Sequence, residues 1–234
     1  MKIQDIFPAR YTLFYLFIGL TAFLFLISAC VTAPPKIEEK KVTPEKKLTP
    51  EEQSQKALEV FNRILSLTEG VEDRQAILPQ MEALYEEIIE NYPDVPLVEE
   101  SYWRLITISI EEFKPPKVDK AEKLYQDFFK KYPDSPLEIY IEETFGTFYY
   151  TNKMWDKLLR FFTPQVKKFI KTGKLDSPYY MFMYSEAKFN LGDLAEAEKG
   201  YKIVIEFFPK TKEGETSKNR LEEIQNLKKQ AGGA

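Results

Sequence analysis

From residue 50 to the end of the chain, apolar residues recur every three or four positions among charged ones. This spacing is that of amphipathic helices, whereas half-buried strands would alternate apolar and polar residues. Proline and glycine interrupt the pattern at intervals, and helices usually end at or near such residues. The fold is therefore predicted to be all-α. After a first helix that ends near Gly70, helices are expected near residues 72–91, 96–113, 118–131, 136–151, 154–171, 177–190, 194–208 and 213–230.

The start of the first helix carries a specific signal. The sequence Thr49-Pro50-Glu51-Glu52 combines a threonine cap, a glutamate three residues later and a proline at the first helical position. This combination predicts that the helix begins at residue 50. Its apolar side is expected to carry Ala57, Leu58, Phe61 and Leu65.

The first thirty residues differ from the rest of the chain. The run from Tyr11 to Ala29 carries no charge, so it can enter a bilayer, and one interpretation is a permanent N-terminal anchor. The run ends, however, in Ile27-Ser28-Ala29-Cys30, which resembles the lipobox of bacterial lipoproteins. The only cysteine of the chain stands where that motif requires it. The resemblance implies that residues 1–29 are a cleaved signal peptide and that Cys30 carries a diacylglycerol with further fatty acyl groups.

Cys30 is predicted to anchor the chain to a membrane, and the residues after it are predicted to be a tether. Burial of acyl chains contributes about 0.8 kcal/mol per CH₂, so two or three chains anchor a protein durably. Residues 31–49 contain three prolines, five lysines and three glutamates, and they have almost nothing to bury. Val31 stands where many inner-membrane lipoproteins carry aspartate. The resemblance therefore implies a lipid-anchored protein on the periplasmic face of the outer membrane.

Three segments of the helical region end alike. In each, a tyrosine is followed eight residues later by a proline, and a residue of modest size precedes the tyrosine by four positions. Spacings of four and eight place these residues on one helix face, and the proline closes the helix. The three sets are Met81, Tyr85 and Pro93; Ala121, Tyr125 and Pro133; and Ala197, Tyr201 and Pro209.

This pattern resembles the tetratricopeptide repeat, an antiparallel helix pair that recurs about every 34 residues. Trp103 occupies the large-aromatic position of the second copy, and a degenerate further copy carries Gly146, Tyr149, Trp155 and Phe162. The resemblance implies a solenoid of about four helix pairs over residues 50–211. Residues 212–234 are then expected to form a capping helix with Leu221, Ile224 and Leu227 on one stripe, followed by a disordered tail.

Composition argues against catalysis, metal binding and nucleic-acid binding. The chain has no histidine, one cysteine and a formal net charge of −4. The commonest general base and metal ligand is thus missing, and a basic face for nucleic acid is not expected. Glu142 and Glu143 are adjacent on a helix and point about 100° apart, so they are no facing acid/base pair. We expect no enzyme activity, no metal and no cofactor beyond the lipid.

A binding function depends on the face that stacked helix pairs present. The first helices of the pairs line such a face, where partners usually lie. Aromatic anchors with a few charges are typical of protein interfaces. Alternatively, some of these side chains fill gaps in an irregular core. Aligning the copies directs these residues toward the predicted groove: Arg104, Tyr140, Glu143, Thr147, Tyr150, Tyr179, Phe182 and Glu186.

Lipobox, basic proline-containing tether and the endings NYPDVPL and KYPDSPL together resemble the BamD-like (YfiO) outer-membrane assembly lipoproteins. That resemblance implies a periplasmic scaffold that contacts the β-barrel insertase and other lipoproteins. Pilotin lipoproteins of type IV pili and partners of the Tol-Pal system have a similar build. From another class, a peptidoglycan-active enzyme or a sugar-binding protein remains an alternative.

Overall fold

The computed structural model describes residues 48–232. The predicted signal peptide, the lipobox with Cys30 and nearly all of the tether lie outside the described residues. The described part is helical throughout and contains no strand. Its helices are α1 (Pro50–Thr68), α2 (Arg74–Asn91), α3 (Leu97–Thr107), α4 (Val118–Lys131), α5 (Glu138–Thr151), α6 (Trp155–Thr172), α7 (Pro178–Asn190), α8 (Leu194–Phe207) and α9 (Lys212–Gly232), with a π-helical turn, η1 (Ile108–Glu112), after α3.

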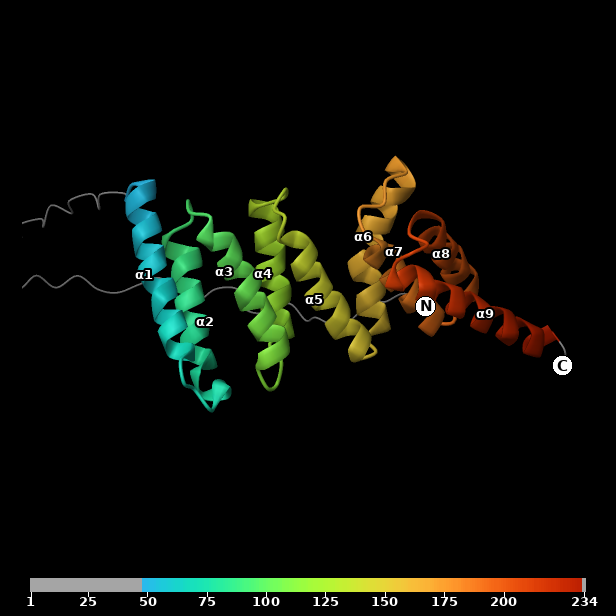
Figure 1. Cartoon of the computed structure of the whole chain (residues 1–234), viewed down its shortest axis with the longest axis horizontal. Coiled ribbons are helices and arrows are strands. Elements are labelled where there is room, and N and C mark those ends of the chain that lie inside the picture. Colours follow the sequence, from blue (N-terminus) through green and yellow to red (C-terminus); the bar gives the residue numbers. More distant parts are fainter. Residues whose placement is uncertain (1–47, 233–234) are drawn as a thin grey trace, which may run out of the picture. The chain divides into compact units, whose positions relative to one another are not determined.

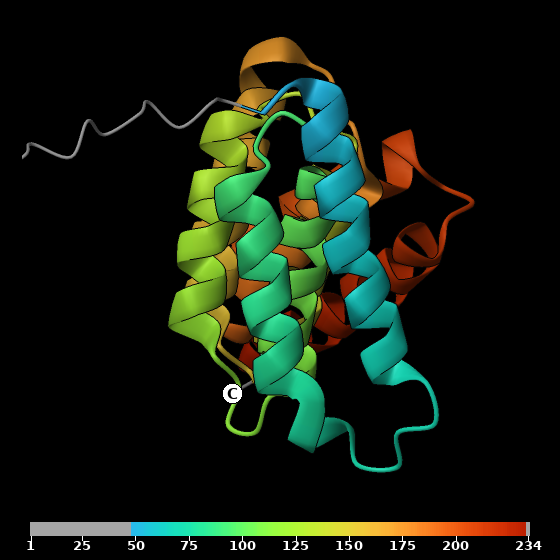
Figure 2. The same ribbon diagram turned by 90° about the vertical axis from the view of Figure 1, so that its left-hand side faces the viewer.

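The helices stack as the repeat pattern predicts. Helices α1 and α2, α3 and α4, α5 and α6, and α7 and α8 pack as pairs, and α9 packs on α8 (Figure 1). Each odd-numbered helix also contacts the next one, so α1, α3, α5, α7 and α9 form a continuous layer. Figure 2 shows the α1–α2 pair in front of the helices that follow it. The structure confirms an all-α, tetratricopeptide-like solenoid of helix pairs.

The start of α1 has the predicted geometry. The Thr49 hydroxyl accepts a hydrogen bond from the backbone amide of Glu52 at 3.2 Å, and the Glu52 carboxylate accepts one from the Thr49 amide at 2.8 Å. Two amides that a helix start leaves unpaired are thus satisfied. The predicted apolar side is partly wrong, because Leu58 and Leu65 are 54% and 47% exposed. The buried stripe instead contains Gln53, Ala57, Val60 and Ile64.

The repeat positions recur at fixed distances from the helix caps. The fourth and eighth residues after the cap are Ala121 and Tyr125 in α4, Leu158 and Phe162 in α6, and Ala197 and Tyr201 in α8. All but Tyr125, which is half-buried, are fully buried. A short or branched residue one turn before a ring therefore lets the neighbouring helices approach, and the ring fills the space between them.

The helix ends follow the prolines where prolines are present. Pro93, Pro133 and Pro209 each stand two residues beyond the last helical residue of α2, α4 and α8. The equivalent position of α6 is Ile170, so α6 continues to Thr172. Gly173 ends it in a left-handed conformation, with φ of 69°, that glycine adopts without steric cost. By contrast Pro79 lies inside α2, which continues past it.

The remaining core positions largely follow the repeat pattern. Tyr85, Gly146 and Tyr149 are buried, and Trp103 and Trp155 are half-buried against the main core. In α9, Ile224 is fully buried with Ala197 and Tyr201, whereas Leu227 is 40% exposed. Within residues 48–232, none of the helices is both long enough and apolar enough to cross a membrane.

Candidate protein-binding surfaces

An aromatic and cationic patch lies where α3 meets α5. The guanidinium carbon of Arg104 is 4.5 Å from the centre of the Trp103 ring, and that ring is 5.6 Å from the ring of Tyr140. Tyr140 is 51% exposed, and Arg104 is also largely exposed while it pairs with Glu100 at 3.2 Å. We call Trp103, Arg104 and Tyr140 the Trp103 patch. It combines the residue types that contribute most to binding at protein interfaces.

A second group of predicted groove residues instead joins α5 to α7. The Tyr179 hydroxyl donates a hydrogen bond to the backbone oxygen of Glu143 at 3.1 Å and lies 3.3 Å from the hydroxyl of Thr147. The helices approach closely here, because a Cβ atom on Gly146 would lie 2.5 Å from that Tyr179 oxygen. Burial raises the pKa of Tyr179 to about 12, so its hydroxyl stays protonated and can donate. The structure thus brings these residues together in a helix contact.

The predicted open position of Glu186 is wrong. Glu186 is fully buried, and its carboxylate accepts hydrogen bonds from the hydroxyls of Tyr201 at 2.7 Å and Tyr150 at 3.1 Å. Arg220 of α9 donates two further bonds to it, each of 2.8 Å. Sequence comparison among the repeats misplaced Glu186 because α9, which is no part of a repeat, covers this end of α7.

Two further predicted groove residues, Tyr150 and Phe182, are half-buried. The Tyr150 ring packs edge-on against Trp155 at 5.5 Å, and Phe182 packs against Tyr201 at 6.3 Å. Phe182 touches each of the apolar clusters in the described part of the chain. Substitution of either residue is therefore expected to lower stability. Of the eight predicted groove residues, Arg104 and Tyr140 present the most accessible aromatic and cationic surface.

A cavity that sequence reasoning missed lies among α4, α5, α6 and α7. It has a volume of about 620 Å³, and aromatic side chains of α4, α6 and α7 line it together with Glu138 and Glu142 of α5. We call it the Glu142 cavity. Glu142 is 1% exposed, and its Oε1 atom accepts hydrogen bonds from the Tyr125 hydroxyl at 2.9 Å and from the Gln165 side chain. The sequence offers one signal, namely a charged residue between the buried apolar positions Ile141 and Phe145.

The carboxyl groups of the Glu142 cavity have raised pKa values. Burial raises the pKa of Glu142, against hydrogen bonds from Tyr180, Tyr125 and Gln165 that lower it. Burial and the neighbouring Glu142 charge raise the pKa of Glu138 to about 7. Two carboxyl groups thus share a partly enclosed space in which ionisation is disfavoured.

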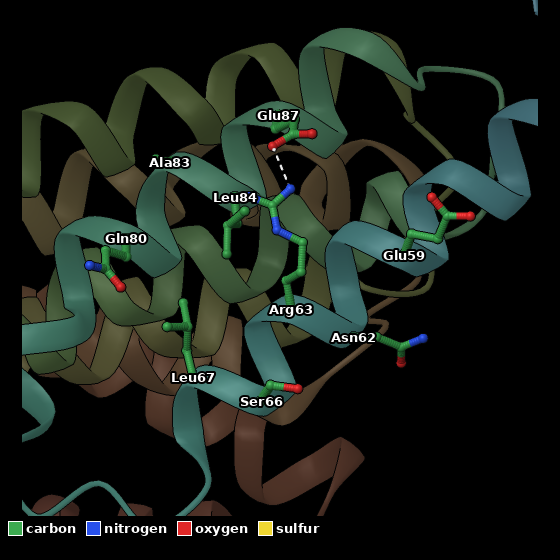
Figure 3. Close-up of a pocket in the computed structure, with 9 residues that line it drawn as sticks. All are labelled: Glu59, Asn62, Arg63, Ser66, Leu67, Gln80, Ala83, Leu84 and Glu87. Carbon is green, nitrogen blue, oxygen red and sulfur yellow. Dashed lines mark hydrogen bonds and ion pairs between the residues drawn. The ribbon is translucent and has the colours of Figure 1, made fainter.

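A groove between α1 and α2 forms another hollow, of about 650 Å³. Figure 3 shows Leu67, Ala83 and Leu84 in this groove, and the ion pair from Arg63 to Glu87, 3.5 Å long, spans it. The other residues that line it are polar: Glu59, Asn62, Ser66 and Gln80. A polar lining is what the end of a solenoid needs where no further pair packs on it.

The part of the chain from residue 48 to 232 holds no group of three or more aspartate, glutamate, cysteine or histidine residues placed to bind a metal ion.

Comparison with protein families matches residues 179–211 to the model described as Tetratricopeptide repeat. The matched residues cover nearly all of α7, the turn after it and α8. A search of curated proteins gave no match. Together with the stacked helix pairs, the family match supports a tetratricopeptide-repeat protein, and such repeats are scaffolds for protein–protein interaction.

Proposed function

We propose that this tetratricopeptide-repeat scaffold is a lipid-anchored periplasmic adaptor that binds other envelope proteins during outer-membrane β-barrel assembly. Its acyl anchor is Cys30 and its mature chain begins there, as the sequence Ile27-Ser28-Ala29-Cys30 indicates. The lysine-rich tether connects the anchor to the helices. The protein has no catalytic role in this proposal, and its partners are the β-barrel insertase or other lipoproteins.

The Trp103 patch is the observation that carries the proposal. An exposed tyrosine, a tryptophan ring and a guanidinium group stand together on two helices of the odd-numbered layer. Such a rigid aromatic surface provides contact area with little loss of side-chain freedom on binding. The negative charge of the chain gives no reason to expect nucleic acid as the partner.

The test is recovery of partners from bacterial cells that express tagged variants of the full chain. We expect wild-type protein to co-purify with the β-barrel insertase after detergent extraction. The double variant Arg104→Ala/Tyr140→Ala should reduce recovery at least about tenfold, since interface aromatic and arginine anchors commonly contribute 2 kcal/mol or more. Both side chains are exposed, so the melting temperature should change little.

Ile170→Ala is the matched control, because Ile170 is 75% exposed on α6 and lies outside the Trp103 patch. It should leave partner recovery unchanged. Cys30→Ala, tested beside it, should abolish incorporation of labelled palmitate and release the protein from the membrane fraction. Equal recovery by the double variant and the wild type would argue against the patch. Recovery of a secretin or of Tol-Pal proteins would redirect the proposal to another envelope assembly.

A further inference from the structure

The Glu142 cavity contains acceptors for which residues 48–232 provide no donor. The side-chain carboxyl group of Glu138 makes no hydrogen bond or ion pair within the described range 48–232, although it lines the cavity. The Oε1 atom of Gln165 has no exposed surface and no hydrogen-bond partner. Buried polar atoms are nearly always paired, so an orphaned acceptor at a cavity wall indicates a donor that comes from outside.

No cation within residues 48–232 forms an ion pair with Glu138 or Glu142, although the charge of Lys168 favours the ionised form of both carboxyl groups. Lys168 lies at the cavity wall but pairs with Asp176 at 3.0 Å, and both side chains are mostly exposed. Lys168 makes no hydrogen bond to Glu142, whose close contacts are hydroxyl and amide donors. A cation that enters the cavity would therefore meet two carboxyl groups that have no salt bridge within residues 48–232.

Part of the cavity wall is aromatic. Tyr125 lies 5.3 Å from Phe161, measured between ring centres, and Phe129 and Tyr180 also line the space. Phe129 is 47% exposed at this position. Ring faces attract cations, and arginine in particular stacks on them.

We propose that the Glu142 cavity binds the guanidinium group of an arginine side chain on a protein partner. The planar fork of a guanidinium provides several donors in fixed directions, which suits the unpaired carboxyl group of Glu138 at the cavity wall. Its flat faces can stack on an aromatic ring of the cavity wall. A volume of about 620 Å³ also leaves room for the backbone that carries the side chain.

Binding should depend on pH through Glu138. Its pKa of about 7 means that the carboxyl group ionises as the pH rises through neutrality, while arginine remains charged. Protonation of Glu138 below that pKa removes a charge that the guanidinium requires, so affinity should fall toward acidic pH. The titratable groups around Glu138 are Asp134 in the preceding loop, Glu142 on α5, Tyr125 on α4, Lys168 on α6, Lys174 and Asp176 in the next loop, and Tyr180 on α7.

The experiment titrates the full-length protein, purified in detergent, with an acetylated and amidated Ala-Ala-Arg-Ala-Ala peptide, using calorimetry. The same peptide with citrulline in place of arginine keeps the shape but lacks the charge. We expect the arginine peptide to bind at least about tenfold more tightly at pH 8. Its affinity should be about tenfold lower at pH 6, where roughly a tenth of Glu138 is ionised.

Glu138→Gln should remove most of this affinity and its pH dependence, and Glu142→Gln should weaken binding while it preserves an oxygen acceptor for Tyr125. Glu206→Gln removes the same charge from an exposed position of α8 and should bind like the wild type. If Glu142→Gln does not fold, the half-buried Glu138 still provides the test. Equal binding of the citrulline or a lysine peptide, or an unchanged affinity in Glu138→Gln, would overturn the assignment.

This inference rests on the proposed function in one respect, namely that the arginine belongs to a protein partner. The peptide titration does not use the envelope partner. If the titration succeeds while the Trp103 patch proves dispensable in cells, the proposed adaptor surface fails and the cavity assignment stands. If the patch variant loses its partners while the peptide titration fails, only the cavity assignment is wrong.

Discussion

Replacing Arg220 with methionine is expected to destabilise the packing of α9 by about 3–5 kcal/mol, because it leaves the buried Glu186 carboxylate without its cation. Arg220 donates two hydrogen bonds to Glu186, and its guanidinium carbon lies 4.9 Å from the Phe189 ring centre. The pKa of Arg220 is raised, chiefly by its hydrogen bonds to Glu186. The folded state therefore stabilises the charged guanidinium more than the unfolded state does.

Hydrogen exchange followed by mass spectrometry measures this effect locally. Peptides from residues 212–232 should exchange at least about 100-fold faster in Arg220→Met, while peptides from α1 and α2 remain protected, since terminal elements of a stacked array open separately. The matched control is Lys228→Met, which removes the exposed ion pair with Glu198 between α9 and α8. An exposed pair contributes roughly 0–1 kcal/mol, so exchange should change little.

The combination Glu186→Gln/Arg220→Met tests the cause. Glutamine keeps an oxygen that accepts hydrogen bonds from Tyr150 and Tyr201 but carries no charge. The double variant should therefore be more stable than Arg220→Met alone. If both variants were equally unstable, lost packing rather than an uncompensated charge would explain the loss.

Phe162→Ala is expected to lower the free energy of unfolding by about 3–5 kcal/mol, since it removes a fully buried ring and leaves a cavity. The ring of Phe162 lies 5.1 Å from Phe161, 5.7 Å from Tyr179 and 5.9 Å from Tyr180, measured between centres. It therefore joins α6 to α7 at the centre of the array. Chemical denaturation monitored by circular dichroism measures the loss, and Ile170→Ala on the same helix should cost little because Ile170 is exposed.

Gly146 provides a direct check of this packing. A Cβ atom added there would lie 2.9 Å from Phe162 and 2.5 Å from the Tyr179 hydroxyl, so Gly146→Ala should destabilise by overpacking. In the Phe162→Leu background the smaller side chain leaves space for the new methyl group. Gly146→Ala should therefore lower the free energy of unfolding by less than it does in the wild type. Strictly additive losses would show that the two residues do not meet.

The positions of the helices could be predicted from the sequence because their signals are local. A capping box or a proline acts within a few residues, and the start of α1 and the ends of α2, α4 and α8 were predicted in this way. The turn η1 was missed, since the pattern over residues 96–113 predicted one uninterrupted helix. Leu58 and Leu65 were misplaced because burial on the first helix of an array is decided by which neighbours are present.

The buried carboxylates could not be predicted because their partners are distant in the sequence. Glu142 is surrounded by Tyr125 and Gln165 from other helices, and Glu186 by Arg220, thirty-four residues away. A glutamate between apolar residues is usually a solvated position, and only the tertiary structure shows donors around it. The Trp103 patch, in contrast, was partly predicted, since Arg104 and Tyr140 lie on corresponding helices of successive repeats.

The most direct test of the adaptor account is photo-crosslinking in intact cells. A photoreactive phenylalanine analogue at position 140 would lie in the Trp103 patch, and the same analogue at position 170 would lie on the exposed side of α6. The account predicts a discrete crosslink from position 140 to an envelope protein that mass spectrometry identifies, and none from position 170. Equal crosslinking at both positions, or none at position 140, would contradict the claim that this face holds a protein partner.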